Sequence, residues 1–276
     1  MFSIPTLFAA LGLVLLKQTL PVAGHGFIQS VTINGYDWPG FDEPHWTKPS
    51  GSAVMVTDYL EPLYDVNARE IACGKNAQAA QGIATVSPND QIQWHWVTHS
   101  YKPWTHNEGT KRSWIASCNG DCSSVDPTTL QWVELTSDFT GPQTWNGVWP
   151  VKIIADGHPW IDKVPPAPNG DYLIRNELTA LHYSWQPYGY SDGSGHGWGI
   201  EMYPTCMAIR ITNSPGTYDM TMATSFPGAY TVNQKGHYNP DLWKDPNSVG
   251  IAETNKFPRS QASPAAPGLL LLLQQW

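Results

Sequence analysis

The sequence predicts an all-β protein, an immunoglobulin- or fibronectin-like β-sandwich with long loops, and three observations lead to this prediction. Short runs rich in β-branched and aromatic residues are separated by clusters of Gly, Pro, Asn, Asp and Ser, as in sandwich domains. No long segment repeats apolar residues at the helical period of 3.6. Only 14% of the 276 residues are charged, whereas long helical arrays are rich in Ala, Glu, Lys and Leu.

Five strands are expected. Each contains β-branched or aromatic side chains, and most have few charges. In chain order they are Phe27–Asn34, Gln91–Val97, Leu130–Thr136, Asp171–Glu177 and Cys206–Thr212. Turn-forming clusters such as SPND, PPAPNGD and GYSDGSGHGWG lie between them. These loops are longer than a minimal sandwich needs, which suggests a functional surface built from loops.

Residues 1–24 have the features of a secretory signal peptide. The apolar run Leu7–Leu16 is followed by small residues (VAG) at the end of this segment. A membrane anchor is the alternative, but the apolar run is shorter than a membrane-spanning helix needs. We therefore expect cleavage after Gly24 and a secreted, extracellular protein that begins at His25.

One domain is expected over residues 25–240, followed by a C-terminal extension over residues 241–276. The extension contains SPAAPG and ends in a short apolar run before QQW, which predicts a poorly ordered segment. The net charge of −8 excludes a nucleic-acid-binding protein that works through a basic face. We expect a monomer with neither a nucleic-acid nor a membrane partner.

The chain contains four cysteines, which are expected to be paired in an oxidising compartment. Four cysteines allow three connectivities. The close pair Cys118 and Cys122 (CNGDC) would close a short loop, and Cys73 and Cys206 would then form a long-range disulfide.

Removal of the signal peptide would give His25 an unusual chemistry. A terminal histidine offers its α-amine and its imidazole Nδ1 to the same ion, and one further imidazole completes a T-shaped set of three nitrogens. Nitrogen ligands in a tetragonal arrangement favour Cu(II). The chain is therefore expected to bind one copper ion, provided that partners for His25 exist elsewhere.

Five sequence segments, taken together and in their order along the chain, carry more information than any one of them alone. They are HGFIQSVTINGYDWPGF from His25, CNGDC, DYLIRNELTALH, EMYPTC and SFPGAY. Together they resemble the fungal lytic polysaccharide monooxygenases of auxiliary-activity family nine, at roughly the spacing of that family. The resemblance covers most of residues 25–230. It implies a copper-dependent oxidoreductase of the secreted β-sandwich class.

The resemblance also implies roles for individual residues. His25 and His106 would be the equatorial copper ligands, Tyr203 would occupy the axial position, and His182 would hydrogen-bond oxygen species near the metal. The family pattern of His, one residue, Gly and Pro is altered after His106, where the chain reads HNEGT. His99 is therefore retained as the alternative second ligand. His95, between two tryptophans, is interpreted as structural.

Glu201 stands two residues before the axial tyrosine, where the resembling family usually has Gln. We hypothesise that an ionised carboxylate here adds negative charge near copper, stabilises Cu(II), lowers the reduction potential and changes oxygen activation. The alternative is that Glu201 pairs with Arg175, which occupies the position of the family's arginine.

The reaction that the resemblance implies is the oxidative cleavage of a β-1,4-linked polysaccharide, cellulose or a related hemicellulose. Hydroxylation at C1 or C4 would use O2 or H2O2 and electrons from an external donor, either a small reductant or a redox enzyme. Two alternatives stay open: a copper-binding protein of the same fold that does not oxidise glycans, and a non-catalytic carbohydrate-binding module.

Exposed aromatic residues are expected to stack on sugar rings. The surface candidates are Tyr36, Trp38 and Tyr230. Other aromatic residues on predicted loops are Tyr188, Tyr190, Trp198, Tyr238 and Trp243.

Overall fold

The computed structural model describes residues 25–40, 49–57, 60–138, 149–187, 199–231 and 238. The predicted signal peptide and C-terminal extension lie outside these residues, so both stay predictions. The same holds for four of the loop aromatics, Tyr188, Tyr190, Trp198 and Trp243. Within the described residues, no helix is both long and apolar enough to cross a membrane.

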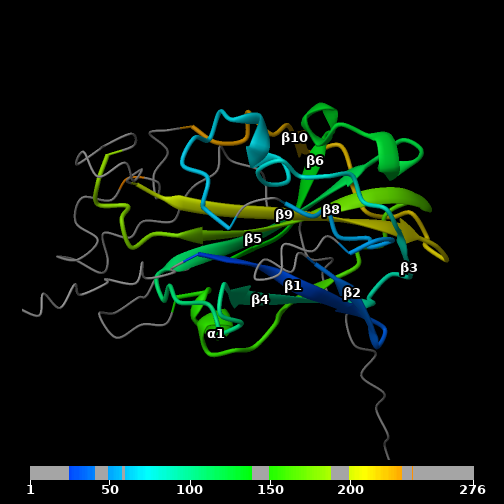
Figure 1. Cartoon of the computed structure of the whole chain (residues 1–276). Helices are drawn as coiled ribbons and strands as arrows, with labels where there is room; N and C mark the ends of the chain where they lie inside the picture. Colours follow the sequence, from blue (N-terminus) through cyan, green and yellow to red (C-terminus); the bar gives the residue numbers. More distant parts are fainter. Residues whose placement is uncertain are drawn as a thin grey trace, which may run out of the picture.

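Two β-sheets lie face to face and form a sandwich, which confirms the predicted fold class (Figure 1). The first sheet is antiparallel throughout, with the order β2-β1-β4-β7. The second sheet has the order β10-β6-β5-β8-β9-β3, and β3 pairs parallel to β9 at its edge. The described helices are one short α-helix and three 3-10 turns, and they lie between strands.

The elements have the following bounds in chain order: β1 Gly26–Ile33, β2 Tyr36–Pro39, η2 Arg69–Ile71, β3 Ala84–Val86, β4 Gln91–Thr98, β5 Gly109–Ser117, η3 Cys122–Ser124, η4 Pro127–Thr129, β6 Trp132–Asp138, α1 Lys152–Ala155, β7 Trp160–Lys163, β8 Gly170–Ala180, β9 Glu201–Ile211 and β10 Ala223–Thr224.

All five predicted strands are present, with shifted ends. The prediction missed β5 at the centre of the second sheet and the shorter strands β2, β3, β7 and β10. The segment GTKRSWIAS contains the adjacent cations Lys111 and Arg112, and in a strand one of two adjacent side chains must face inward, so the segment does not look like a buried strand. Arg112 is nevertheless buried, with its guanidinium 5.2 Å from the ring centroid of Tyr230. The start of β9 was missed because Pro204 lies inside it, and proline usually marks the limit of a strand.

Both predicted disulfides are confirmed. Cys73 joins Cys206 over 133 residues, which ties the loop between η2 and β3 to the middle of β9. Cys118 joins Cys122 and closes the short turn after β5. The long-range bond holds β9 beside the segment that follows η2.

A buried carboxylate joins the two sheets. Asp162 on β7 accepts hydrogen bonds from the indole nitrogens of Trp94 and Trp160 at 2.9 and 3.1 Å. It also accepts one from the Ser113 hydroxyl at 2.6 Å, across the sandwich on β5. Burial raises the pKa of Asp162, while these hydrogen bonds act against that rise.

The β1–β2 hairpin places two of the predicted sugar-contacting residues far from the predicted copper ligands. Asn34 and Gly35 have φ values of 51° and 77°, as a two-residue hairpin turn requires, and Ile33 pairs with Tyr36. Tyr36 and Trp38 therefore lie near the end of β1 opposite to His25, roughly 20–25 Å away for extended backbone. They form an edge-to-face pair there, with 59% of Tyr36 exposed, but they do not lie near the predicted copper ligands.

We predict that Asp162→Asn lowers the free energy of unfolding by roughly 1–3 kcal/mol, because an amide cannot accept all the donors that the carboxylate satisfies. Chemical denaturation at neutral pH measures this loss. Asp37→Asn, at an exposed carboxylate on β2, is the matched control and should change stability by less than about 0.5 kcal/mol. Equal effects of the two substitutions would contradict the role given to Asp162.

Candidate metal centre

Strand ends from both sheets meet at one end of the sandwich, here called the site edge. In the second sheet, Ala180 at the end of β8 pairs with Gly109 at the start of β5 and with Glu201 at the start of β9. In the first sheet, Gly26 at the start of β1 pairs with Thr98 at the end of β4. Residues just outside these strand ends are therefore collected at one edge (Figure 1).

Three of the predicted site residues form a tight cluster at this edge. His106 precedes β5, His182 follows β8, and Glu201 begins β9. His106 Nε2 lies 3.5 Å from Glu201 Oε2, and His182 Nε2 lies 3.6 Å from Glu201 Oε1. The two imidazole rings are stacked, with centroids 4.0 Å apart and planes 11° apart. One ligand atom from each of the three residues lies within 4.8 Å of the others.

Tyr203 is the neighbour of this cluster on β9. Its phenol donates a hydrogen bond of 2.7 Å to Glu201 Oε2, and its side chain is buried. Trp104 packs edge-on against both Tyr203 and His106, with ring centroids at 4.8 and 5.2 Å. Trp104 was not among the residues predicted from the sequence, although its position two residues before His106 in the segment PWTH is a usable signal.

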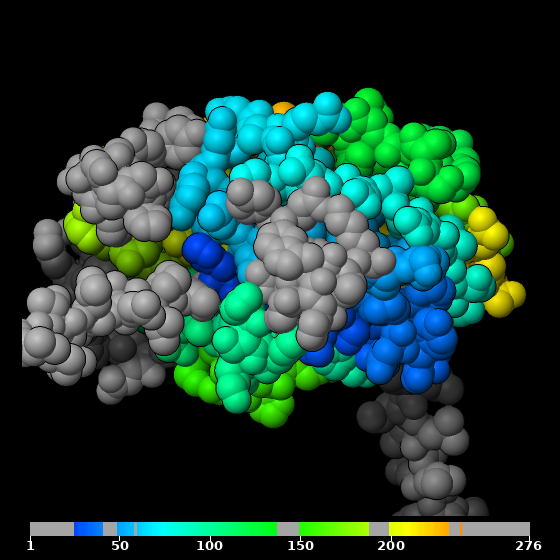
Figure 2. All heavy atoms as spheres, viewed as in Figure 1, coloured from blue at the N-terminus to red at the C-terminus, as the bar shows by residue number. Residues whose placement is uncertain are grey.

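His25 lies beside the cluster, immediately before β1. Burial is the main cause that lowers the pKa of His182 to about 3, and the nearby charges of His106 and His25 add to it. In Figure 2 the start of β1 (dark blue, left of centre) reaches the surface near the yellow-green segment that follows β8. A Cβ atom on Gly26 would lie 2.6 Å from the Val97 carbonyl oxygen and 2.7 Å from the Trp104 ring. Glycine at this position therefore lets the chain approach Trp104 closely.

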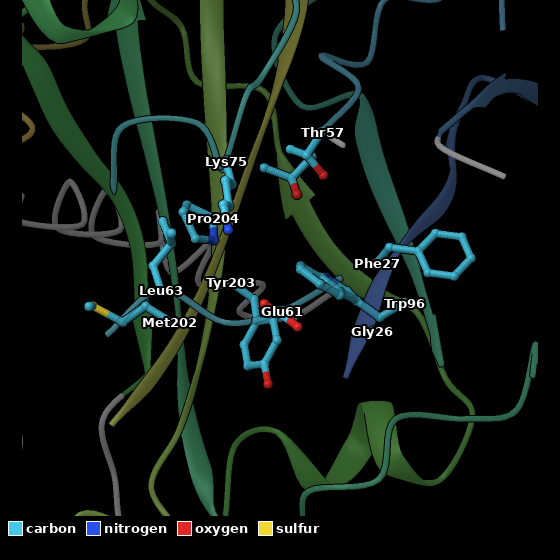
Figure 3. A pocket seen from close by; sticks show the side chains of 12 residues that line it. Gly26, Phe27, Thr57, Glu61, Leu63, Lys75, Trp96, Met202, Tyr203 and Pro204 are labelled. Atoms are coloured by element: carbon cyan, nitrogen blue, oxygen red, sulfur yellow. The ribbon is translucent and has the colours of Figure 1, made fainter. Parts of the chain in front are cut away.

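A cavity of about 20 Å³ lies beside Tyr203 and Gly26 (Figure 3). Thr57, Glu61 and Lys75 contribute polar groups to its wall. The phenol oxygen of Tyr203 points away from Thr57 and Lys75 in this view. The cavity is large enough for about one water molecule. It is too small to receive a larger ligand.

The electrostatics of the cluster centre on Glu201. Burial raises the pKa of its carboxyl group to about 7, and the hydrogen bond from Tyr203 acts in the opposite direction. Tyr64, which was not predicted from the sequence, lies close enough to respond to this charge. The pKa of its phenol is raised by burial and by the Glu201 charge.

The alternative pairing of Glu201 with Arg175 is wrong. Arg175 is fully buried and donates to Glu177, and its guanidinium also donates to the carbonyl oxygens of Ile71 and Ala72. Arg175 pairs with Cys206 in the sheet register, five residues along β9 from Glu201. At about 3.3 Å per residue this separation is roughly 16 Å, which exceeds the reach of an arginine side chain folded inward.

Tyr230 is also corrected: only 3% of it is exposed, so it is not a surface residue. Its hydroxyl donates to Glu177 Oε1 at 2.9 Å, and its ring packs on Phe226.

His99 lies on the exposed turn after β4, outside the cluster. The Nε2 atom of His95 lies 2.9 Å from the Thr32 hydroxyl oxygen. This contact agrees with the interpretation of His95 as a structural residue.

The donor set at this edge is suited to copper. It contains imidazole nitrogens, which Cu(II) favours, and no thiolate, because all four cysteines are in disulfides. His25 would add its imidazole and, once residue 24 is removed, its α-amine. Tyr203 contacts this cluster as well, because its phenol hydrogen-bonds to Glu201 and its ring packs against Trp104.

Comparisons with known proteins agree with one another. The model of Auxiliary Activity family 9 (formerly GH61) matches residues 25–248. The AA9 family lytic polysaccharide monooxygenase D of Gloeophyllum trabeum is 31% identical over 247 residues, which cover 88% of this chain and 67% of that relative. The AA9 family lytic polysaccharide monooxygenase A of Talaromyces pinophilus is 34% identical over 248 residues, covering 83% and 74%. The extended catalytic domain of H. jecorina LPMO9A has a TM-score of 0.66 at 26% identity, covering 84% of this chain and 87% of that one.

The raised pKa of Glu201 predicts a pH-dependent stability of the metal-free protein. The folded state holds this proton up to about pH 7, whereas an unfolded glutamate releases it near pH 4.3. The folded state therefore binds more protons between these values, and Glu201 reduces stability progressively as the pH rises from about 4.3 to 7. Glu201→Gln should remove this loss.

We expect the stability of Glu201→Gln relative to the unsubstituted protein to increase by up to about 3 kcal/mol between pH 4 and pH 8. Denaturant titrations with a chelator present, at several pH values, measure this difference. A difference that stays constant over the whole pH range would contradict the burial of an uncompensated carboxylate.

Proposed function

The chain belongs to Auxiliary Activity family 9 and is a lytic polysaccharide monooxygenase; from this premise we propose that it cleaves cellulose or a related β-1,4-linked hemicellulose. The cleavage would follow hydroxylation at C1 or C4 of a sugar unit. It would use O2 or H2O2, with electrons from a small reductant or a redox enzyme. We further propose that the protein is secreted as a monomer after cleavage behind Gly24.

One observation carries this proposal: His106, His182, Glu201 and Tyr203 converge at the edge of the sandwich where His25 immediately precedes the first strand. His25, through its α-amine and imidazole, and His106 would hold copper, and Tyr203 would be a third candidate ligand. Bound copper would supply the one-electron chemistry that activates the oxidant. The match to the family model begins at His25, which supports removal of residues 1–24.

The surrounding side chains would orient these ligands. Trp104 packs against both His106 and Tyr203, so it limits the rotation of each ring. Glu201 accepts the Tyr203 hydrogen bond and so holds the phenol oxygen in one direction. His182 stacks on His106 and reaches the exposed edge, where its imidazole would form a hydrogen bond to the oxidant. Such positioning contributes to ligand geometry as much as the ligands themselves do.

The function test uses copper-loaded protein that begins at His25, incubated with cellulose or xyloglucan, a reductant and O2 or H2O2. Mass spectrometry of the soluble products should detect oligosaccharides oxidised at C1 or C4. A matched protein that keeps Gly24 in front of His25 should lose these products, because it has no α-amine at His25. Tight copper binding without oxidised products would favour the copper-binding alternative. Glycan binding without copper binding would favour the carbohydrate-binding module.

We propose that Glu201 tunes the copper potential through its charge. A carboxylate near the ion stabilises Cu(II) over Cu(I) and lowers the midpoint potential. Glu201→Gln should therefore raise the potential at pH 8 by tens of millivolts, where about 59 mV corresponds to a tenfold change for one electron. Glu61→Gln, at an exposed carboxylate beside the Tyr203 cavity, is the control and should have a much smaller effect. An unchanged potential and turnover in Glu201→Gln would overturn the proposal.

The aromatic surface next to the site is proposed to bind the glycan. Trp185 is 39% exposed and lies in the turn three residues after His182. Tyr101 is 40% exposed and packs edge-on against Phe27, close to the start of β1. These residues take the place of Tyr36, Trp38 and Tyr230 as candidates for sugar stacking near the metal.

Trp185→Ala is predicted to weaken binding to cellulose by roughly three- to tenfold, because an aromatic stacking contact contributes about 0.5–1.5 kcal/mol. Binding isotherms with insoluble cellulose measure this change. Tyr36→Ala removes an exposed aromatic residue at the far end of β1 and should leave the isotherm unchanged. The reverse result would place the glycan at the hairpin.

A further inference from the structure

The carboxylate of Glu201 gives this site a negatively charged oxygen ligand for a metal ion, which an amide at the same position would not provide. It faces two imidazoles, through His106 Nε2 at 3.5 Å and His182 Nε2 at 3.6 Å. Among the described residues, no lysine or arginine contacts it; its contacts are with these histidines and with Tyr203. A buried carboxylate without a cationic partner is costly in a folded protein, and a bound metal ion removes that cost.

The spacing of the three residues suits an ion better than it suits hydrogen bonds. Hydrogen bonds from nitrogen to oxygen are usually about 2.9–3.0 Å long, and both histidine–glutamate distances exceed this by about half an ångström. Ligand atoms bound at about 2.0–2.2 Å around a tetrahedral ion lie roughly 3.3–3.6 Å from one another. The observed 3.5 and 3.6 Å fall in that interval, each to a different oxygen of Glu201, and one ligand atom from each of the three residues lies within 4.8 Å of the others.

We propose that His106, His182 and Glu201 form a second metal-binding set, which holds a divalent ion such as Zn²⁺ without any contribution from the amino terminus. Two histidines and one glutamate, with a water molecule as fourth ligand, are a frequent zinc donor set. The two rings are stacked in parallel, so both must rotate about their Cβ–Cγ bonds before their Nε2 lone pairs converge on one ion.

The two sets share His106 and therefore exclude each other. The set proposed for copper needs the α-amine of His25 and so exists only after residue 24 has been removed. The His106–His182–Glu201 set is complete in a chain that still carries residue 24. It does not depend on the proposed function, because it requires neither copper redox chemistry nor a glycan. Zn²⁺ bound in this set would compete with copper for His106 after processing.

The test is a calorimetric titration of Zn²⁺ into a protein that keeps Gly24 before His25 and therefore lacks a free amine at His25. We expect one Zn²⁺ per chain. Glu201→Gln and His182→Ala, made separately in this protein, should each weaken binding at least tenfold. His158→Ala, at an exposed histidine before β7, is the matched control and should leave the affinity unchanged. Thermal denaturation with a chelator establishes that each variant is folded.

Replacing Zn²⁺ by Co²⁺ gives a second readout, since the visible absorption of Co²⁺ reports its ligands. The spectrum should change in both site variants and stay the same in His158→Ala. Absence of stoichiometric Zn²⁺ binding, or an affinity that survives both Glu201→Gln and His182→Ala, would overturn the proposal. Glycan oxidation is measured separately with the protein that begins at His25, so failure of the proposed function leaves the Zn²⁺ result interpretable.

Discussion

The pairing of Ala180 with Gly109 on one side and with Glu201 on the other is the constraint on which the site depends. It places the start of β5, the end of β8 and the start of β9 on one line, so that residues from three distant parts of the chain meet. A Cβ atom on residue 109 would lie 2.2 Å from the Thr179 carbonyl oxygen, so only glycine allows β5 to approach β8 this closely. A change of register by one residue would turn Glu201 to the opposite face and separate it from both histidines.

Contacts deeper in the sandwich hold this register in place. The Cys73–Cys206 disulfide and the hydrogen bonds from Arg175 to the carbonyl oxygens of Ile71 and Ala72 fix the same loop against the second sheet. Asp162 connects the two sheets through β4, β5 and β7. The site edge is thus supported by buried polar groups as well as by apolar packing, and its candidate ligands begin or flank the strands that these groups hold.

The sequence was sufficient for the parts of the account that depend on local pattern and on family motifs. The sandwich class and both disulfide pairs were predicted correctly. The structure brings the predicted His106, His182, Glu201 and Tyr203 together, although their roles as ligands stay proposals. The failures have physical reasons. The adjacent cations Lys111 and Arg112 made a buried strand look exposed in the sequence. Pro204 made the start of β9 look like the limit of a strand. Tyr230 lies in a motif that gives no information about its burial. A hairpin places Tyr36 and Trp38 at the end of β1 opposite to His25, which their sequence motif does not reveal.

The central claim is that His106, which lies at the site edge just before β5, joins the N-terminal His25 as a copper ligand. Electron paramagnetic resonance of the copper-loaded protein that begins at His25 tests this most directly, beside the spectra of His106→Ala and His99→Ala. Loss of a nitrogen ligand should change the Cu(II) spectrum of His106→Ala and leave that of His99→Ala as it is. An unchanged spectrum in His106→Ala, or a changed one only in His99→Ala, would contradict the account.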